Sequence, residues 1–188
     1  ELARLRRVHL VACGTSWHAA LVGKFLIEEL TGLPTEVDYA SEYRYRRPLL
    51  GDDLLVVGIT QSGETADTLA AMEMAEAAGA LLATVCNSRG SSAWRLAKSR
   101  MLTQAGPEIG VASTKAFTTQ LVAFVLMALD LRAARGMGDE IDEVLVRDLQ
   151  RLPMAIERAL AIDDEIYRHA TDLLSGATDS LYLGRGIL

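Results

Sequence analysis

The sequence contains few of the residues that mark disulfide-rich or metal-binding proteins. Its 188 residues include two cysteines, three histidines and 5% aromatic residues. Cys13 and Cys86 each end an apolar run, where a buried free thiol is the most common state. The histidines His9, His18 and His169 have no cysteine or acidic residue at the spacing of metal ligands. We therefore expect a reducing cytoplasmic setting, no disulfide and no metal.

Long hydrophobic runs and an excess of positive charge are also missing. No stretch reaches the roughly 18 to 20 uncharged apolar residues that a membrane-spanning helix requires. The net charge of −6 would repel a nucleic-acid backbone, and the arginines within residues 4–7 and 44–47 form two short, separate groups. Because half of the residues are hydrophobic, the composition predicts a soluble globular protein that binds neither nucleic acid nor membrane.

Apolar runs alternate with helical patterns through the first part of the chain. The runs at residues 8–12, 54–59 and 81–85 indicate buried strands, and residues 35–40 and 101–103 fit two more. Helical patterns occupy the segments between them, with Leu21, Phe25, Leu26 and Leu30 on one face of the first and short helices at Ser41 and at residues 91–97. This alternation predicts an α/β fold with a parallel sheet covered on both faces, a three-layer sandwich.

Beyond Ala112 the pattern changes to long helices. They are expected over residues 113–134, 140–161 with an interruption at Pro153, and 164–174, and they form a helical extension with apolar faces suited to an interface. The chain begins with glutamate and stops just after a strand-like segment at residues 180–183. We therefore expect one domain over residues 1–175 and the first strand of a truncated further domain over residues 176–188.

One turn combines the features of an anion-binding site. It follows a buried strand, opens a helix, and consists of Thr60, Gln61, Ser62, Gly63, Glu64 and Thr65. The first N–H groups of a helix lack partners, and the helix dipole places about half a positive charge there. Gly63 lets the backbone approach a phosphate, whereas Glu64 should face away from it. The alternative is a plain helix cap at Ser62 or Thr65.

Two further loops should lie at the same edge of the sheet. Residues 13–16 occupy the equivalent turn of the first strand, and the glycine-bracketed loop at residues 106–115 enters the longest helix. Plain helix caps explain both loops equally well, although Lys115 at a helix start favours an anionic neighbour. A dinucleotide site is disfavoured because no Gly-x-Gly-x-x-Gly follows either strand.

The three loops together resemble the sugar isomerase (SIS) domains of the glutamine–fructose-6-phosphate aminotransferase family. The resemblance runs from about Val8 to the end of the chain and rests on residues 13–16, 62–68 and, most specifically, 108–120. It implies a flavodoxin-like SIS fold without a cofactor. It also implies that this is the first of two SIS domains that follow a glutaminase domain and together convert fructose 6-phosphate into glucosamine 6-phosphate.

The resemblance also assigns roles by position. The phosphate would bind to Thr60, Gln61, Ser62 and Thr65. Thr15 and Ser16 would meet the sugar phosphate, and the sugar would be lined by Val111, Ala112 and Ser113. Thr60 stands where the family usually has serine, which preserves a hydroxyl. The catalytic residues of the family belong to the second SIS domain, so this chain is expected to bind but not to catalyse alone, and to form a homodimer packed on that second half.

Two alternatives remain open. The first is another enzyme with an SIS domain, such as an arabinose-phosphate isomerase or a muramic-acid phosphate etherase, which would share the phosphate turn; the match over residues 108–120 argues against it. The second is a non-catalytic sugar-phosphate sensor, which the acidic charge and the lack of a helix-turn-helix restrict to a ligand-sensing role.

Overall fold

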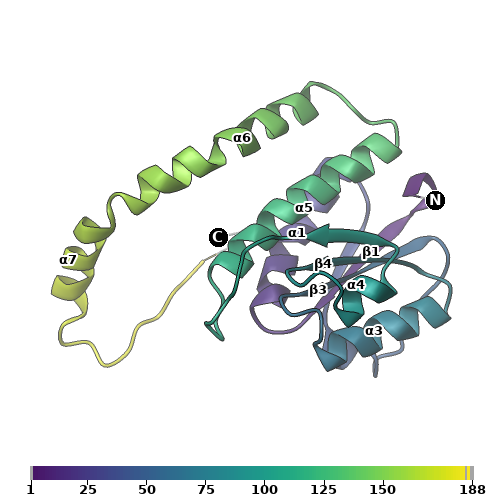
Figure 1. Ribbon diagram of the computed structural model, residues 1–188, viewed down its shortest axis with the longest axis horizontal. Coiled ribbons are helices and arrows are strands. Elements are labelled where there is room, and N and C mark those ends of the chain that lie inside the picture. The colour runs from purple at the N-terminus through teal and green to yellow at the C-terminus, as the bar shows by residue number, and fades with distance from the viewer. Residues whose placement is uncertain (1, 185, 187–188) are drawn as a thin grey trace. The chain divides into compact units, whose positions relative to one another are not determined.

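Five parallel strands form one sheet in the order β2-β1-β3-β4-β5. In this computed structural model, which describes residues 2–184 and 186, the strands are β1 (Arg7–Ala12), β2 (Thr35–Tyr39), β3 (Leu54–Thr60), β4 (Leu81–Cys86) and β5 (Ser99–Leu102) (Figure 1). The order is that of flavodoxin-like doubly wound sheets, in which ligands bind beyond the carboxyl ends of the strands. The predicted parallel sheet is confirmed.

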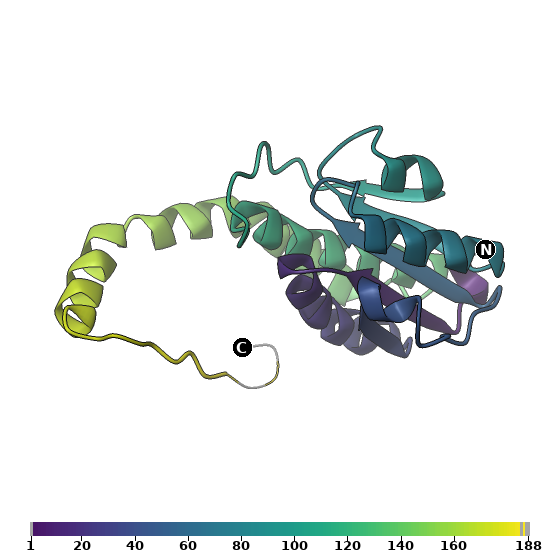
Figure 2. The same ribbon diagram turned by 90° about the horizontal axis from the view of Figure 1, so that it is seen from below.

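Helices cover both faces of this sheet (Figures 1 and 2). One face carries α1 (Thr15–Thr31) and α5 (Lys115–Ala134), and the other carries α2 (Ala40–Tyr43), α3 (Ala66–Ala77) and α4 (Ser92–Leu96). A short 3-10 helix (Leu2–Arg4) precedes β1. The three-layer sandwich predicted from the alternation of strands and helices is confirmed.

Side chains of the central strands alternate between two cores. On β1, Val8 and Leu10 pack with α1 and α5, whereas Val11 packs with α2 and α3. All seven residues of β3 are buried, which is why its sequence is an unbroken apolar run rather than an alternating one. The sheet is thereby fixed in register, and the loops that leave its carboxyl edge are held at fixed positions.

The buried face of α1 differs from the predicted one. The buried residues of α1 include the small residues Ala19, Ala20 and Gly23 together with Ile27. Phe25, in contrast, is 44% exposed. Close approach of α5 explains the difference, since a Cβ atom at Gly23 would lie 2.7 Å from the ring of Phe124. Small residues on α1 make room for a large ring on α5, so size decided the packed face more than hydrophobicity did.

Several predicted boundaries need correction. The helix α2 begins at Ala40 after Tyr39, so Ser41 does not cap it. The helix expected to begin at Ser113 begins at Lys115. The predicted interruption at Pro153 is absent, because this exposed proline lies within a continuous helix, where water can satisfy the carbonyl that loses its partner.

The chain divides into two compact units, Glu1–Met137 and Gly138–Leu188. The second unit contains α6 (Glu140–Leu160) and α7 (Asp163–Leu174), whose described residues are mostly exposed and strongly amphipathic. Residues 180–183 form no strand, because a strand requires a partner and no described segment pairs with them. Their assignment to a further domain stays a prediction.

Among the described residues, α5 alone has the length and composition of a membrane-spanning helix. Eight of its residues are buried within the first unit, and they include the polar side chains of Gln120 and Arg132. Arg132 donates to the carbonyl of Leu30 at the end of α1 over 2.7 Å. These contacts are those of a helix that belongs to the core of the sandwich.

A buried histidine and tyrosine pair lies on the other face of the sheet. His9 on β1 is 3% exposed, and its Nδ1 lies 2.7 Å from the hydroxyl of Tyr43 on α2. The guanidinium of Arg46 lies over the ring of Tyr43. It donates hydrogen bonds to Glu36 over 2.8 Å and to Asp38 over 2.7 Å, both on β2. Burial lowers the pKa of His9, and the neighbouring charges of Glu36, Asp38, Arg7 and Arg46 act in both directions.

Replacing Gly23 by alanine should destabilise the first unit. The new methyl group meets the ring of Phe124, and overpacking of about 1 to 3 kcal/mol exceeds the helix propensity gained, roughly 1 kcal/mol. Urea unfolding measures the change, with Gly176→Ala as the control because its new Cβ meets open space. A Gly23→Ala variant as stable as the parent would contradict the close packing of α1 on α5.

The buried state of His9 predicts a pH dependence of stability. Because its pKa is lowered in the folded chain, the unfolded chain binds the proton at higher pH. The stability that the buried, neutral His9 contributes is therefore fully present above the ordinary histidine pKa of about 6.5. It is lost as the pH falls towards the lowered pKa. Denaturant unfolding between pH 7.5 and 5.5 should show a smaller pH slope for His9→Gln than for the parent chain, and an equal slope would contradict the lowered pKa of His9.

Candidate functional site

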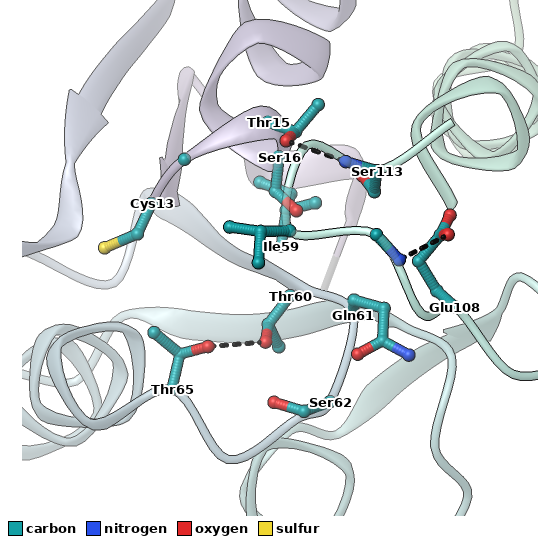
Figure 3. A pocket seen from close by; sticks show the side chains of 13 residues that line it. Cys13, Thr15, Ser16, Ile59, Thr60, Gln61, Ser62, Thr65, Glu108 and Ser113 are labelled. Carbon is teal, nitrogen blue, oxygen red and sulfur yellow. Dashed lines mark hydrogen bonds between the residues drawn. The ribbon is translucent and has the colours of Figure 1, made fainter. Parts of the chain in front are cut away.

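A cavity of about 280 Å³ lies at the carboxyl ends of β1 and β3 (Figure 3). It is lined by residues 13–16, by residues 59–62 with Thr65, and by Glu108, Gly110, Val111 and Ser113. The three loops that the sequence marked therefore meet at one place, although the third lies about a hundred residues from the first along the chain. Parallel pairing of Ala12 with Ile59 sets the first two loops side by side.

The turn after β3 presents hydroxyl groups from one side of this cavity. The hydroxyls of Thr60 and Thr65 lie 2.9 Å apart, and Thr60 Oγ1 also accepts a hydrogen bond from the backbone of Gly63 over 3.2 Å. The hydroxyl of Ser62 accepts from the backbone of Glu64 over 3.1 Å. These bonds close the turn on itself ahead of α3, which has no side-chain cap at its N-terminus. Amide groups of this helix end remain suited to an anion.

The same turn is attached to the neighbouring strand and helix. The carbonyl of Gln61 accepts from the backbone of Asn87 over 3.0 Å, and that of Gly63 accepts from Ala93 over 3.0 Å. Gly63 has a φ of 73°, and any side chain there would collide with Ser91, so both conformation and space require glycine. The turn therefore has little freedom to change shape.

Glu64 faces away from the cavity, as its charge predicted. Its carboxylate accepts from the backbone of Ser92 over 2.8 Å at the N-terminus of α4. This backbone bond, followed by the Ser92 side chain, holds the pKa of Glu64 below its usual value. The glutamate of the turn thus attaches the turn to a neighbouring helix.

The turn after β1 presents two hydroxyls from the opposite side of the cavity. Thr15 Oγ1 accepts from the backbone of Ser113 over 3.4 Å, and Ser16 Oγ accepts from the side chain of Gln120 over 2.9 Å. Gly14 precedes the helix with a φ of 59° and provides no side-chain cap. The first turn of α1 is thereby tied to the third loop through Thr15 (Figure 3) and to α5 through Ser16.

Glu108 organises the third loop, a role that the sequence analysis did not assign. Its carboxylate accepts backbone hydrogen bonds from Gly110 at 3.4 Å, Thr114 at 3.1 Å and Ala116 at 3.2 Å. It therefore caps α5 from six to eight residues upstream, beyond the spacing of a capping box. The bond from Ala116 is the main reason that the pKa of Glu108 lies below its usual value, and the charge of Lys115 adds to the shift.

A second side chain fixes the base of this loop. Asn87, directly after β4, accepts with Oδ1 from the backbone of Ala105 at 2.8 Å and from the hydroxyl of Thr103 at 3.1 Å. Its Nδ2 donates to the carbonyl of Gly106 over 2.7 Å. Because Asn87 also bonds Gln61 through its backbone, one residue connects the second loop to the third.

The structure brings together eight of the nine predicted site residues. Thr15, Ser16, Thr60, Gln61, Ser62, Thr65, Val111 and Ser113 all line the cavity. Ala112 does not line it and is exposed to solvent, and the side chain of Val111 is fully exposed although the residue borders the cavity. Residues 111 and 112 lie in a bend of the loop with exposed side chains, whereas Ser113 is half-buried.

The cavity offers mainly hydrogen-bonding groups. Hydroxyls, an amide and backbone N–H groups dominate, and the ionisable side chains among the described lining residues are Cys13 and Glu108. The carboxylate of Glu108 is committed to three backbone donors, and its lowered pKa keeps it ionised at neutral pH. Both cysteines are free, and burial raises the pKa of Cys86, which lies outside this cavity. The part of the chain that the structure describes holds no cluster of metal-ligating side chains.

Comparison with known proteins identifies relatives along the whole chain. The model of the SIS domain family matches residues 1–130. The chain is 46% identical to the glutamine–fructose-6-phosphate aminotransferase [isomerizing] of Chlorobaculum tepidum over 186 residues, which are 99% of this chain and 30% of that protein. The enzyme of the same name from Gloeobacter violaceus is 49% identical over 98% of this chain and 30% of its own length.

A solved structure agrees with the sequence comparison. The C-terminal domain of glucosamine-fructose-6-phosphate aminotransferase from Francisella tularensis superposes with a TM-score of 0.93 at 36% identity. The match covers 99% of this chain and 53% of that domain. The chain thus spans about 30% of the length of the curated relatives and about half of the related structure.

Removing the Glu108 carboxylate should loosen the third loop without unfolding the sheet. In Glu108→Ala the backbone amides of Thr114 and Ala116 lose their acceptor, so their hydrogen exchange should become faster, while amides of β3 keep their protection. Because the pKa of Glu108 is lowered, the parent chain should show the same loosening only as the pH falls below the ordinary carboxyl range. Unchanged exchange in Glu108→Ala would contradict the capping role.

Proposed function

The chain belongs to the SIS domain family and matches glutamine–fructose-6-phosphate aminotransferases over nearly its whole length, and from that premise we propose that it binds a sugar phosphate. The observation that carries the proposal is the meeting of three loops around one cavity rich in hydroxyls at the carboxyl edge of the sheet. The phosphate would bind in the turn at residues 60–65. The ligand class is fructose 6-phosphate or glucosamine 6-phosphate.

The chemistry of the turn supports a phosphate more than another polar group. Ser62 and Thr65 offer hydroxyls beside a helix N-terminus without a side-chain cap, and Gln61 adds an amide. No lysine or arginine lines the cavity among the described residues, so hydrogen bonds and the helix dipole would provide the whole attraction. The turn is already closed by internal bonds, which reduces the entropy lost on binding.

The size of the cavity supports a monosaccharide. At about 280 Å³ it lies near the lower end of ligand pockets, which span roughly 300 to 1,000 Å³. A hexose phosphate suits this volume better than a dinucleotide. Thr15, Ser16 and Ser113 would contact the sugar phosphate from the side opposite the turn, with Val111 and Ala112 contributing backbone contacts to the sugar.

We propose further that this part of the enzyme binds and does not isomerise by itself. A proton transfer between sugar carbons needs a base near the substrate, and Glu108 is a weak one, because the backbone hydrogen bonds that it accepts hold its pKa below the usual value. The complete enzyme would be cytoplasmic and would use glutamine as the nitrogen source. Its second SIS half would supply the reacting groups, and the enzyme would work as a homodimer.

Binding should depend on the phosphate and on the hydroxyls of the turn. Calorimetric titration of this chain with fructose 6-phosphate, glucosamine 6-phosphate and fructose should show heat only for the phosphorylated sugars. Ser62→Ala combined with Thr65→Ala should weaken their binding by about 1 to 3 kcal/mol, because two hydrogen bonds to a charged group are lost.

A matched hydroxyl deletion provides the control. The hydroxyl of Thr171 on α7 bonds the carbonyl of Tyr167 in its own helix, so Thr171→Ala should leave the affinity unchanged. A folded double variant at Ser62 and Thr65 with the parent affinity would refute the phosphate turn. Equal affinity for fructose and fructose 6-phosphate would refute phosphate recognition altogether.

A further inference from the structure

Gln120 is a buried amide with only part of its hydrogen-bonding capacity used. It lies on α5, is 1% exposed, and donates through Nε2 to Ser16 Oγ over 2.9 Å. Its Oε1 is buried and has no hydrogen-bond partner among the described residues. An unpaired buried acceptor lowers stability by about 1 to 3 kcal/mol, so an apolar residue of similar size would serve the core better. The remaining contact, at Ser16, lies at the cavity.

The contact with Gln120 determines what the hydroxyl of Ser16 can do. A serine hydroxyl carries one proton and two acceptor lone pairs. Because the amide of Gln120 occupies a lone pair, the proton of Ser16 stays available for donation, and no acceptor for it lies among the described residues. Ser16 lines the cavity, so the proton can be donated to a ligand there.

Thr15 shows the same arrangement one residue earlier. Its Oγ1 accepts from the backbone of Ser113, which again leaves the hydroxyl proton for an acceptor in the cavity. The pair Thr60 and Thr65 differs, since one of these two hydroxyls donates to the other. The N-terminus of α1 therefore presents two hydroxyl protons that are free for donation. In both cases a donor from the segment 113–120 occupies a lone pair of the hydroxyl oxygen.

We propose that Gln120 is a positioning residue that holds Ser16 as a hydrogen-bond donor to an oxygen of the bound sugar phosphate. This inference rests on the proposed function, because the acceptor is the ligand. It extends the site beyond the residues that line the cavity, to the core helix α5. It also explains why α5 has a buried amide that lowers the stability of the core. Gln120 itself does not touch the ligand.

A double-mutant cycle tests the proposal on the 188-residue chain. In Gln120→Leu the Ser16 hydroxyl loses its fixed direction, and fructose 6-phosphate should bind about three- to tenfold more weakly, as expected for one hydrogen bond. In a Ser16→Ala background the same substitution should have no further effect, because the group through which it acts is gone. Thr119→Val is the control, since its hydroxyl bonds the carbonyls of Lys115 and Ala116 within α5.

Stability separates positioning from a structural role. Gln120→Leu removes the unpaired acceptor, so the variant should unfold at the same or a higher urea concentration while it binds more weakly. Gln120→Glu provides a second variant with the opposite chemistry. At neutral pH its carboxylate would accept the Ser16 proton and withdraw the donor from the ligand, so the affinity should fall by about tenfold or more.

The outcomes distinguish this inference from the proposed function. If the parent chain binds no phosphorylated sugar, the proposed function fails and the positioning role fails with it. If the parent binds but Gln120→Leu binds equally well, or if its effect persists in full in the Ser16→Ala background, only the positioning role is overturned. Weaker binding of Gln120→Leu that disappears in that background supports both.

Discussion

Parallel pairing of the strands is the constraint on which the site depends. Since β1 and β3 run side by side in the same direction, the two turns that follow them leave the sheet at the same edge. Each turn enters a helix, so helix N-termini also gather there. Backbone pairing alone therefore collects donors for an anion, and the side chains of the turns then adjust the site.

The loops support one another across long stretches of sequence. Asn87 joins the turn at residues 60–65 to the base of the third loop, and Glu64 joins the same turn to α4. Thr15 and Ser16 receive their hydrogen bonds from residues 113 and 120. A site built in this way is rigid before a ligand arrives, because each loop is fixed by another loop as well as by its own strand.

The sequence predicted the strands and the meeting of the loops because both follow from local patterns. Unbroken apolar runs such as β3 have few other interpretations, and a polar turn behind each run marks the carboxyl edge. Contacts that depend on shape were not predictable. The choice of Gly23 instead of Phe25 for the packed face of α1 depends on the ring of Phe124, about a hundred residues away. Glu108 was missed because it caps a helix from outside the usual spacing.

The carboxylate of Glu108 also bears on the direction in which a ligand can enter. Three helices begin at or beside the cavity, and the N-terminus of α5 already holds an anion that the chain itself provides. The N-termini of α1 and α3 have no side-chain cap. The wall at α5 therefore attracts a negatively charged group less than the walls at α1 and α3, so the internal carboxylate gives the cavity a polarity. A molecule with one charged and one neutral end would be favoured in one orientation.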